Sequence, residues 1–408
     1  MAKSPIPPEI VSAGAVPILT AEMHTTGEPT RIIYSGFPEP KGSTLLQKLA
    51  DVEANHDHVR KRLMLEPRGH KEMYGALLVN ETELTATGEA DIGVIFMHTA
   101  GYSPMCGHAT IAVSRFLVDF DPEACPGLFP KRNFQLDEET MTTALRLHCP
   151  CGVVNVSVPV VVRGPHGRLL SDPKRPISFI SVESYATAID LEIPLPEPYR
   201  WPELGDRTSL TADISFGGNF YCLVEAEQLG FKDGLRSSET DALSRATAKL
   251  RDAINADPAR YRPYFQHPTK PELSYLYGVI VTDPQRGGSV PAEGADGAEV
   301  GLCFFGAQQI DRSPCGSGSS ARRALAHAKL RWPPERRWTY HSFLSDACGG
   351  LGGFTASVVA AKSADQPNGL STAGEKVRIR VEGQAFYIGF ATFLVEAADG
   401  ISASGFVA

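Results

Sequence analysis

The sequence predicts a mixed α/β (α+β) chain built from two similar halves. Each half contains a strand-like run, then a turn that holds glycine and cysteine, and then a helical run. The first of these turns contains Cys106 and the second contains Cys315. The chain has 408 residues, which is more than one ordinary hydrophobic core organises. The length and the repeated pattern therefore both favour a two-domain protein.

The first half alternates short strands with two helices. Residues 45–64 carry apolar side chains at helical spacing among many charges, which indicates an exposed amphipathic helix. Residues 111–120 are apolar on most sides, which is typical of a buried helix. Apolar, often β-branched runs predict the strands, which we place at residues 16–22, 30–34, 74–79, 92–98, 143–148, 153–162 and 177–182.

The second half opens with residues 191–206, where four prolines suggest an inter-domain linker. Residues 240–255 form a charged helical run, and residues 283–300 are rich in Gly, Ala and Glu, as in a surface insertion. The remaining predicted strands lie at residues 211–225, with a central Gly-Gly, and at 276–282, 302–305 and 377–397.

Composition excludes several classes of protein. Hydrophobic residues make up 42% of the chain and charged residues 21%, and the formal net charge is −8 with no long basic run, so we expect no nucleic-acid partner. No apolar stretch approaches the roughly 20 residues of a membrane span, and residues 1–15 resemble a Pro-rich, disordered leader rather than a signal peptide. Eight cysteines are too few for a disulfide scaffold, so a reducing, cytoplasmic location is expected.

The two cysteine turns predict a site for a small carboxylate. In both turns a cysteine precedes a glycine and a helix-compatible run, Cys106-Gly107-His108 and Cys315-Gly316-Ser317. A cysteine at a helix N-terminus lies in a positive potential that favours the thiolate, and the first helical amides can hold an anion. Two such turns suggest a carboxylate held between two helix ends, with a sulfur on each face.

That arrangement suits inversion at an α-carbon. Racemisation needs a base on one face to remove the α-proton and an acid on the other face to return one. A thiolate and a thiol can fill both roles and exchange them for the reverse reaction. Amides around the carboxylate would stabilise the charge that develops on it.

The chain resembles the proline racemase family, which also holds hydroxyproline 2-epimerases and trans-3-hydroxy-L-proline dehydratases. The resemblance covers about residues 16–400, and the string DRSPCGSG is its most specific part. The other supporting strings are MHTTGEPTRII, HDHVRKRLMLEPRGHKEMYGALLV, GYSPMCGHATIAVSRF, HCPCGVV, DISFGGNFY and GQAFYIGFATF.

The resemblance implies a diaminopimelate-epimerase-like fold, in which each half wraps sheet around a central helix and the active site lies in the cleft between the halves. It places the first half at residues 16–190, with 383–408 returning to it, and the second half at 191–382. It further implies that no cofactor is needed, that the substrate is a cyclic imino acid, and that a homodimer is possible. No metal site is expected.

By the same resemblance, Cys106 and Cys315 are the two acid/base residues. Asp311 and His108 would contact the ring nitrogen of the substrate. The carboxylate would be held by backbone amides, which belong to Gly107, His108, Gly316 and Ser317.

The branch of the family sets the reaction. The strings EPRGHKEMYGA and HCPCG are most similar to the dehydratase branch, which typically carries Thr where this chain has Cys315. A dehydratase needs one base, whereas a racemase needs a group on each face. Because function depends on the site, we expect a cofactor-independent racemase or 2-epimerase of proline or hydroxyproline. The alternatives are a trans-3-hydroxy-L-proline dehydratase, which is a lyase giving a pyrroline-2-carboxylate, and a non-catalytic binding protein of the same fold.

Two segments depart from the family pattern. Thr26 occupies the position of the first glycine of HTGGEP, and the glycine loop at 349–356 is longer than usual and ends in Phe-Thr-Ala. Four other cysteines are expected to be buried, inert side chains, namely Cys125, Cys222, Cys303 and Cys348. The run His148-Cys149-Pro150-Cys151 has no second pair to complete a metal site, so a turn at a strand end is expected.

Overall fold

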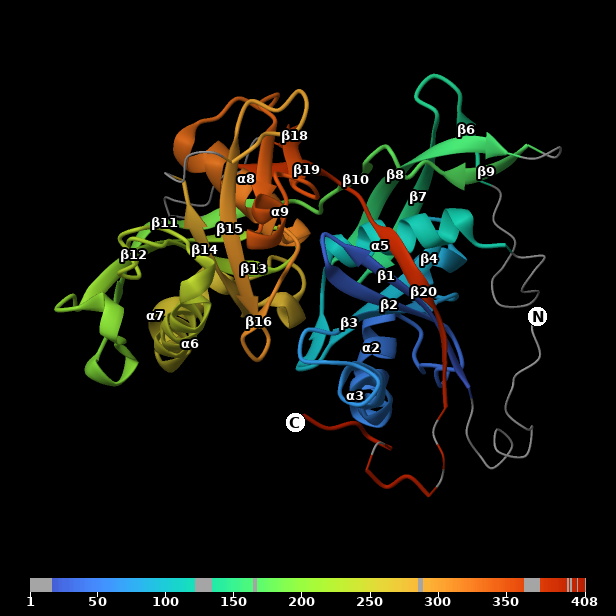
Figure 1. Cartoon of the computed structure of the whole chain (residues 1–408), viewed down its shortest axis with the longest axis horizontal. Helices are drawn as coiled ribbons and strands as arrows, with labels where there is room; N and C mark the ends of the chain where they lie inside the picture. The colour runs from blue at the N-terminus through green and yellow to red at the C-terminus, as the bar shows by residue number, and fades with distance from the viewer. Residues whose placement is uncertain are drawn as a thin grey trace. The chain divides into compact units, whose positions relative to one another are not determined.

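The computed structural model describes residues 17–121, 134–163, 167–284, 289–362, 375–394, 396, 398–401 and 403–407. The chain forms two compact units (Figure 1). Unit 1 comprises Met1–Phe179 and Gln384–Ala408, and unit 2 comprises Ile180–Gly383. The predicted leader at residues 1–15 lies outside the described residues.

Unit 1 is built on one run of hydrogen-bonded strands, in the order β20, β1, β2, β3, β4, β7, β8 and β9. The C-terminal strand β20 pairs antiparallel with β1, so the end of the chain completes the sheet of the first unit. The strands are β1 (Ile18–Thr25), β2 (Glu28–Ser35), β3 (Tyr74–Val79), β4 (Ile92–His98), β5 (Gly101–Ser103), β6 (Leu136–Asp137), β7 (Thr142–Cys149), β8 (Gly152–Arg163), β9 (Arg168–Ser171), β10 (Ile177–Ile180) and β20 (Phe386–Phe393).

Unit 2 has the corresponding run β11, β12, β13, β14, β15, β17, β18 and β19. Its strands are β11 (Tyr185–Pro194), β12 (Ser209–Phe216), β13 (Phe220–Glu225), β14 (Leu276–Asp283), β15 (Ala298–Phe305), β16 (Gln309–Ile310), β17 (Trp338–His341), β18 (Phe354–Lys362) and β19 (Lys376–Gly383).

The two units repeat the same pairing pattern. From β1 to β8 the successive pairs are antiparallel, parallel, antiparallel, parallel and antiparallel. From β12 to β18 the same alternation occurs in the same order. The short strands β5 and β16 each pair antiparallel with the fourth strand of this series, β4 and β15, and each leads into a cysteine turn. The predicted similarity of the halves is therefore confirmed in their topology, which their sequences do not show.

One helix lies at the centre of each unit (Figure 1). Helix α5 (Gly107–Asp119) packs against β1, β2, β3, β8 and β9, and all but two of its residues are buried. Helix α8 (Gly316–Leu330) packs against β11, β12, β13, β18 and β19. A helix surrounded in this way needs small or apolar side chains on most sides, which the runs GHATIAVS and GSGSSA supply. The two buried arginines of α8 have polar partners, since Arg322 pairs with Glu299 at 2.9 Å and Arg323 donates to the Pro333 carbonyl at 2.7 Å. The predicted sheet around a central helix is confirmed in both units.

The other helices lie outside these centres. Helices α2 (Leu45–Asn55), α3 (Asp57–Met64) and α4 (Glu83–Ala86) belong to unit 1. Helices α6 (Thr240–Ala256), α7 (Pro258–Tyr261) and α9 (Phe343–Ala347) belong to unit 2, with short 3-10 turns at Glu197–Tyr199, Pro202–Leu204, Ser237–Glu239, Arg262–Phe265 and Pro271–Leu273.

Four expectations for individual elements are corrected. The helix predicted at 45–64 is broken at His56, which ends α2 and precedes α3. The segment 191–206 is not a linker, because it completes β11 and forms two 3-10 turns within unit 2. The strand predicted at 211–225 is a hairpin of β12 and β13 around Gly217 and Gly218. The insertion predicted at 283–300 is shorter, because β14 runs through Asp283 and β15 begins at Ala298.

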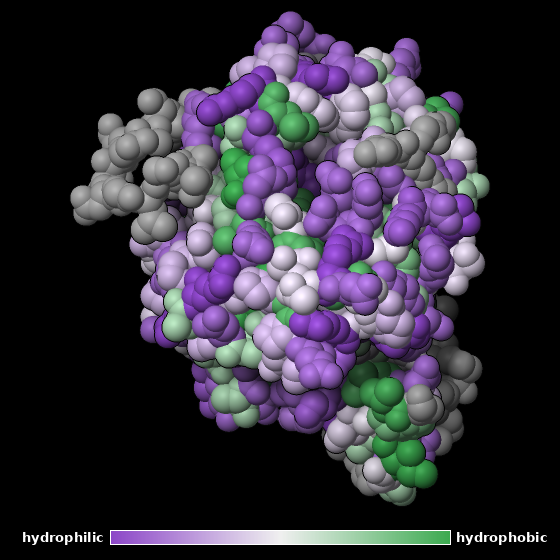
Figure 2. Space-filling model, turned by 90° about the vertical axis from the view of Figure 1, so that its left-hand side faces the viewer, coloured by the Kyte–Doolittle hydropathy of each residue, from purple (hydrophilic) through white to green (hydrophobic). Residues whose placement is uncertain are grey.

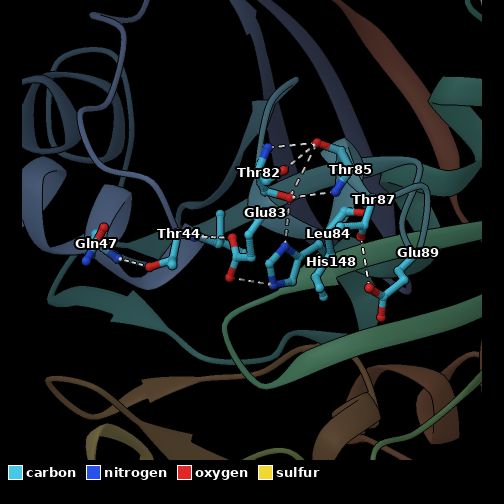
Figure 3. Close-up of polar contacts among 10 residues, drawn as sticks. Thr44, Gln47, Thr82, Glu83, Leu84, Thr85, Thr87, Glu89 and His148 are labelled. Atoms are coloured by element: carbon cyan, nitrogen blue, oxygen red, sulfur yellow. Dashed lines mark hydrogen bonds and ion pairs between the residues drawn. The ribbon is translucent and has the colours of Figure 1, made fainter.

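A cluster of polar contacts joins α2, α4 and β7 in unit 1 (Figure 3). His148 Nδ1 lies 2.9 Å from Thr82 Oγ1, and His148 Nε2 lies 3.8 Å from a Glu83 oxygen. The other Glu83 oxygen accepts the Leu45 N–H, 2.8 Å away, at the start of α2. Thr82 and Thr85 also form a reciprocal capping box that begins α4. His148 thus contacts the residues that begin α4, and Glu83 links them to the start of α2.

The surface that Figure 2 displays, on the side of α6 and β12, is mostly hydrophilic. Hydrophobic residues are scattered over it, apart from one group at the lower right of the view. Within the described ranges no helix combines the length and the apolar character that a membrane crossing requires.

Candidate active site

The first cysteine turn places a thiol at the N-terminus of the central helix of unit 1. Cys106 is the N-cap of α5, and its Sγ accepts the Ala109 N–H at 3.4 Å. The Cys106 carbonyl accepts the first helical hydrogen bond from the Thr110 N–H at 3.0 Å. The side chain is 5% exposed. The positive end of the helix dipole therefore faces the sulfur, which favours the thiolate.

His108 lies beside this thiol as a neutral imidazole. Its Nδ1 is 3.3 Å from Cys106 Sγ, and its ring meets Tyr74 edge-on with centroids 4.7 Å apart. Complete burial lowers the pKa of His108 to about 3, against a hydrogen bond to the Pro29 carbonyl that raises it. The imidazole is therefore uncharged near neutral pH, so it can hydrogen-bond but not supply a positive charge.

The second cysteine turn is organised by a chain of side-chain hydrogen bonds. Asp311 Oδ1 accepts both the N–H and the hydroxyl of Ser313, at 2.9 and 2.7 Å. Ser313 Oγ in turn accepts the Cys315 N–H at 3.2 Å. Asp311 thus shapes the turn that presents the cysteine. Its predicted contact with a substrate nitrogen stays a prediction.

Cys315 begins α8 in a strained backbone conformation. Its φ is +64°, a region that L-residues rarely occupy, and its carbonyl accepts the Ser319 N–H at 2.6 Å. A Cβ at Gly318 would lie 2.9 Å from Cys315 Sγ, so only glycine leaves room for the sulfur there. The second glycine of CGSG therefore has a definite steric role.

A polar network surrounds Cys315 in unit 2. Tyr221 Oη lies 3.5 Å from Cys315 Sγ and 2.7 Å from Ser317 Oγ. The Asn219 amide donates to Ser317 Oγ at 3.2 Å and to Tyr221 Oη at 3.4 Å. Burial raises the pKa of Tyr221 well above its usual value, and negative charge at Cys315 raises it further. The phenol therefore stays protonated and is able to donate.

The predicted carboxylate-binding amides occupy the first turn of each helix. Gly107 and His108 are the first two residues of α5, and Gly316 and Ser317 are the first two of α8. Amides at these positions precede the first i to i−4 hydrogen bonds, so the helix itself gives them no carbonyl partner. Each turn is thus chemically suited to an anion, and the binding itself stays a prediction.

The remaining cysteines follow the expectation with one correction. Cys222 and Cys303 are buried, whereas Cys348, expected to be buried, is exposed at the end of α9. Cys125 lies outside the described residues. The His148–Cys151 run is the predicted turn, a hairpin between β7 and β8 in which Cys149 pairs with Gly152. Among the described residues, no group of three or more His, Cys, Asp or Glu side chains could hold a metal ion.

Sequence reasoning missed Tyr221 and Asn219. Both follow the Gly-Gly of SFGGNFY, where a Cβ at Gly217 would lie 2.2 Å from the Ser317 carbonyl oxygen. Paired glycines in a strand run often mark a close approach of two backbones. The paired glycines could therefore have predicted that the residues after them pack closely against another element. They do not indicate that this element carries Cys315.

Comparison with known proteins identifies the family. The proline racemase family model matches residues 20–407. The chain belongs to the proline racemase family. Its curated relatives include the trans-L-3-hydroxyproline dehydratase of Pongo abelii, 37% identical over 94% of this chain and 93% of the relative. The trans-3-hydroxy-L-proline dehydratase of Homo sapiens is 36% identical over the same shares of both chains.

Two solved structures of family members show the same fold. One is a hydroxyproline epimerase from Agrobacterium vitis with bound trans-4-hydroxy-L-proline, and the other is a probable proline racemase from Agrobacterium radiobacter with bound carbonate. Each has a TM-score of 0.72 and 21% identity, and the match covers 96% of both chains. The diaminopimelate-epimerase-like fold class that the family resemblance implied is confirmed, and the protein is an enzyme of this family.

Proposed function

We propose that this proline racemase family member is a trans-3-hydroxy-L-proline dehydratase. The observation that carries the proposal is the 36–37% identity to dehydratases over 93–94% of both chains. A likeness of that extent covers both cysteine turns and the strands around them. It supports the dehydratase, which was the alternative at first, more strongly than the racemase that Cys315 led us to expect.

The stereochemistry of the substrate makes one thiol sufficient. In the trans isomer the carboxylate and the 3-hydroxyl lie on opposite faces of the ring, so the α-proton and the hydroxyl share a face. The Cys106 thiolate takes the α-proton, the new C2–C3 double bond forms, and the C3–O bond breaks. The hydroxide leaves as water with that proton, and a pyrroline-2-carboxylate remains. Helix-end amides at the substrate carboxylate would stabilise the charge that develops in this step.

One observation favours a second candidate, a proline or hydroxyproline 2-epimerase. Cys315 is a thiol at the N-terminus of α8, where the dehydratase branch typically carries threonine, and a phenol lies 3.5 Å from its sulfur. A thiol in that position can return a proton to the opposite face of the α-carbon, which a threonine hydroxyl does far less readily. A single chain that retains both thiols is chemically equipped for either outcome.

Products formed in deuterated water separate the two candidates. The protein is incubated with trans-3-hydroxy-L-proline, trans-4-hydroxy-L-proline and L-proline, and each mixture is followed by NMR. Loss of the 3-hydroxyl is expected with the first compound. Appearance of an α-deuterated D-epimer from the other two, without dehydration, would favour the epimerase instead. Saturable binding of all three without exchange or product would indicate a non-catalytic binding protein.

Two variants sharpen the result. The Cys315→Thr variant should retain dehydration of trans-3-hydroxy-L-proline and lose any epimerisation. The Cys106→Ser variant should lose both reactions by at least about 100-fold, the usual scale of a lost general base. Dehydration that depends on Cys315 as strongly as on Cys106 would contradict the one-thiol scheme.

A further inference from the structure

The polar network around Cys315 has a role that neither the family motifs nor the comparisons assign. Its members come from three places in unit 2, namely Asn219 before β13, Tyr221 on β13 and Ser317 on α8. All three are buried, with 3%, 0% and 2% of their surface exposed. Water competes little with hydrogen bonds in such a place.

The hydrogen-bond directions in this network are constrained at one end. The side-chain nitrogen of Asn219 can only donate hydrogen bonds, and it lies 3.2 Å from Ser317 Oγ. The Ser317 hydroxyl, which accepts this bond, can therefore donate its own hydrogen bond to Tyr221 Oη, 2.7 Å away. The Tyr221 hydroxyl, which accepts from Ser317, can then donate a hydrogen bond to Cys315 Sγ, 3.5 Å away. In this arrangement the hydrogen bonds run in one direction, from Asn219 through Ser317 and Tyr221 to the sulfur of Cys315.

We infer that Tyr221 is a positioning residue that stabilises the thiolate form of Cys315 by donating its phenolic hydrogen to the sulfur. When Cys315 is a thiol, the path reverses: the S–H donates to Tyr221 Oη and the phenol donates to Ser317. The same three groups thus serve both protonation states. The inference goes beyond the proposed dehydratase, whose one-thiol step does not use Cys315. It gives Cys315 the ability to hold and release a proton, which the second candidate, the 2-epimerase, requires.

The other titratable groups near this network do not supply the same effect. Tyr277 on β14 meets the Tyr221 ring edge-on, with centroids 5.7 Å apart, and Cys303 on β15 interacts electrostatically with Tyr221. Asp311 reaches Cys315 only through Ser313, which binds the Cys315 amide. Of these groups Tyr221 alone has its hydroxyl within hydrogen-bond distance of the sulfur in the contacts described.

The test is the pH dependence of iodoacetamide labelling at each cysteine, read peptide by peptide by mass spectrometry. Two forms of the full chain are compared. Both have the exposed Cys348 replaced by Ser, and one of them also carries Tyr221→Phe. Loss of the phenolic donor should move the midpoint of Cys315 labelling upward by at least about half a pH unit, a lower bound for the loss of one hydrogen bond to the thiolate. The midpoint of Cys106 labelling in the same sample should not move.

Two controls keep the result interpretable. Tyr185→Phe removes a buried phenolic oxygen of unit 2 that has no hydrogen-bond partner among the described residues, so it should leave both midpoints unchanged. Cys222, which has 0% of its surface exposed, reports on folding, because it becomes labelled only if unit 2 opens. An unchanged Cys315 midpoint in a folded Tyr221→Phe protein overturns the inference. The labelling needs no substrate, so a failure of all three substrates to react would count against the proposed function alone.

Discussion

The two thiols are alike in sequence and differ in their immediate neighbours. Cys106 has a neutral imidazole at 3.3 Å and the Ala109 amide at 3.4 Å. Cys315 has a phenol at 3.5 Å and no side-chain capping bond of its own. Because the two sulfurs have different partners, we expect the loss of Cys106 and the loss of Cys315 to affect the reaction differently. The side chains around each sulfur therefore influence whether one thiol or both thiols take part in the reaction.

The neutral state of His108 should make the fold sensitive to acid. Its pKa is about 3 in the folded protein and near 6.5 when unfolded. Its contribution is fully present above pH 6.5 and is lost as the pH falls toward 3, because only the unfolded chain binds the proton in that window. Relative to His108→Gln, the wild-type free energy of unfolding should fall by about 2 kcal/mol more between pH 6.5 and 5. Urea unfolding at several pH values measures this, and parallel curves for the two proteins would contradict it.

At the scale of elements, the hairpin between β1 and β2 shows what one departure from the family pattern costs. Thr25 pairs with Glu28, so the turn consists of Thr26 and Gly27, and both have positive φ, +54° and +77°. Two-residue hairpin turns of this kind favour glycine or asparagine at the first position. The glycine that is usual in the family is thus replaced here by a β-branched residue in a conformation that suits it poorly.

Thr26→Gly should therefore stabilise the protein. Relief of the left-handed conformation outweighs the added freedom of the unfolded chain, which gives a net gain of about 0.5–1 kcal/mol in the free energy of unfolding. Urea denaturation measures the change. Glu138→Gly serves as the control, because this exposed turn residue is not among those with positive φ. It should destabilise the protein, and a loss of stability in both variants would refute the explanation.

The start of α4 depends on one hydroxyl that serves two elements. Thr82 Oγ1 accepts the Thr85 N–H at 3.2 Å and lies 2.9 Å from His148 Nδ1 on β7. Thr82→Ala should lower the free energy of unfolding by about 1–3 kcal/mol, since it removes a helix cap and a buried polar contact together. Thr87→Ala, at the exposed end of the same helix, should cost less than about 0.5 kcal/mol. Equal costs in urea denaturation would show that the His148 cluster does not stabilise unit 1.

At the scale of the whole molecule, each unit supplies one cysteine turn at the start of its central helix. The repeated pairing pattern places Cys106 after β5 and Cys315 after β16 in the same way. The epimerase reaction requires one substrate to reach both sulfurs, whereas the dehydratase reaction requires Cys106 alone.

Protection from alkylation distinguishes these requirements. In the Cys348→Ser background, pyrrole-2-carboxylate, a planar analogue of the substrate, should slow iodoacetamide labelling of Cys106 and Cys315 with one shared concentration dependence. At saturation the labelling of both should fall by at least about 10-fold, while the baseline at buried Cys222 and Cys303 stays unchanged. Protection of Cys106 alone would assign the ligand to unit 1 and leave Cys315 outside the binding site.

The family, the fold class and most of the elements could be predicted from the amino-acid sequence alone. The Cys-Gly turns before helical runs, and strings such as DRSPCGSG, are local features, and local features can be recognised without knowledge of the folded chain. The strands at 74–79 and 92–98 agree with β3 and β4 for the same reason, because an apolar run between turn residues defines a buried strand locally.

Which residues surround each sulfur depends on how distant parts of the chain pack together. Tyr221 and Ser317 lie far apart in the sequence and meet because β13 packs against α8, which no periodicity reveals. The prolines of 191–206 do not mark a linker, since proline also suits the end of a strand and the first turn of a 3-10 helix. The burial of His108, which fixes its charge, likewise depends on Tyr74 and Pro29 from other strands. Hydrogen bonding and burial are properties of the assembled core, and they set the chemistry of the two thiols.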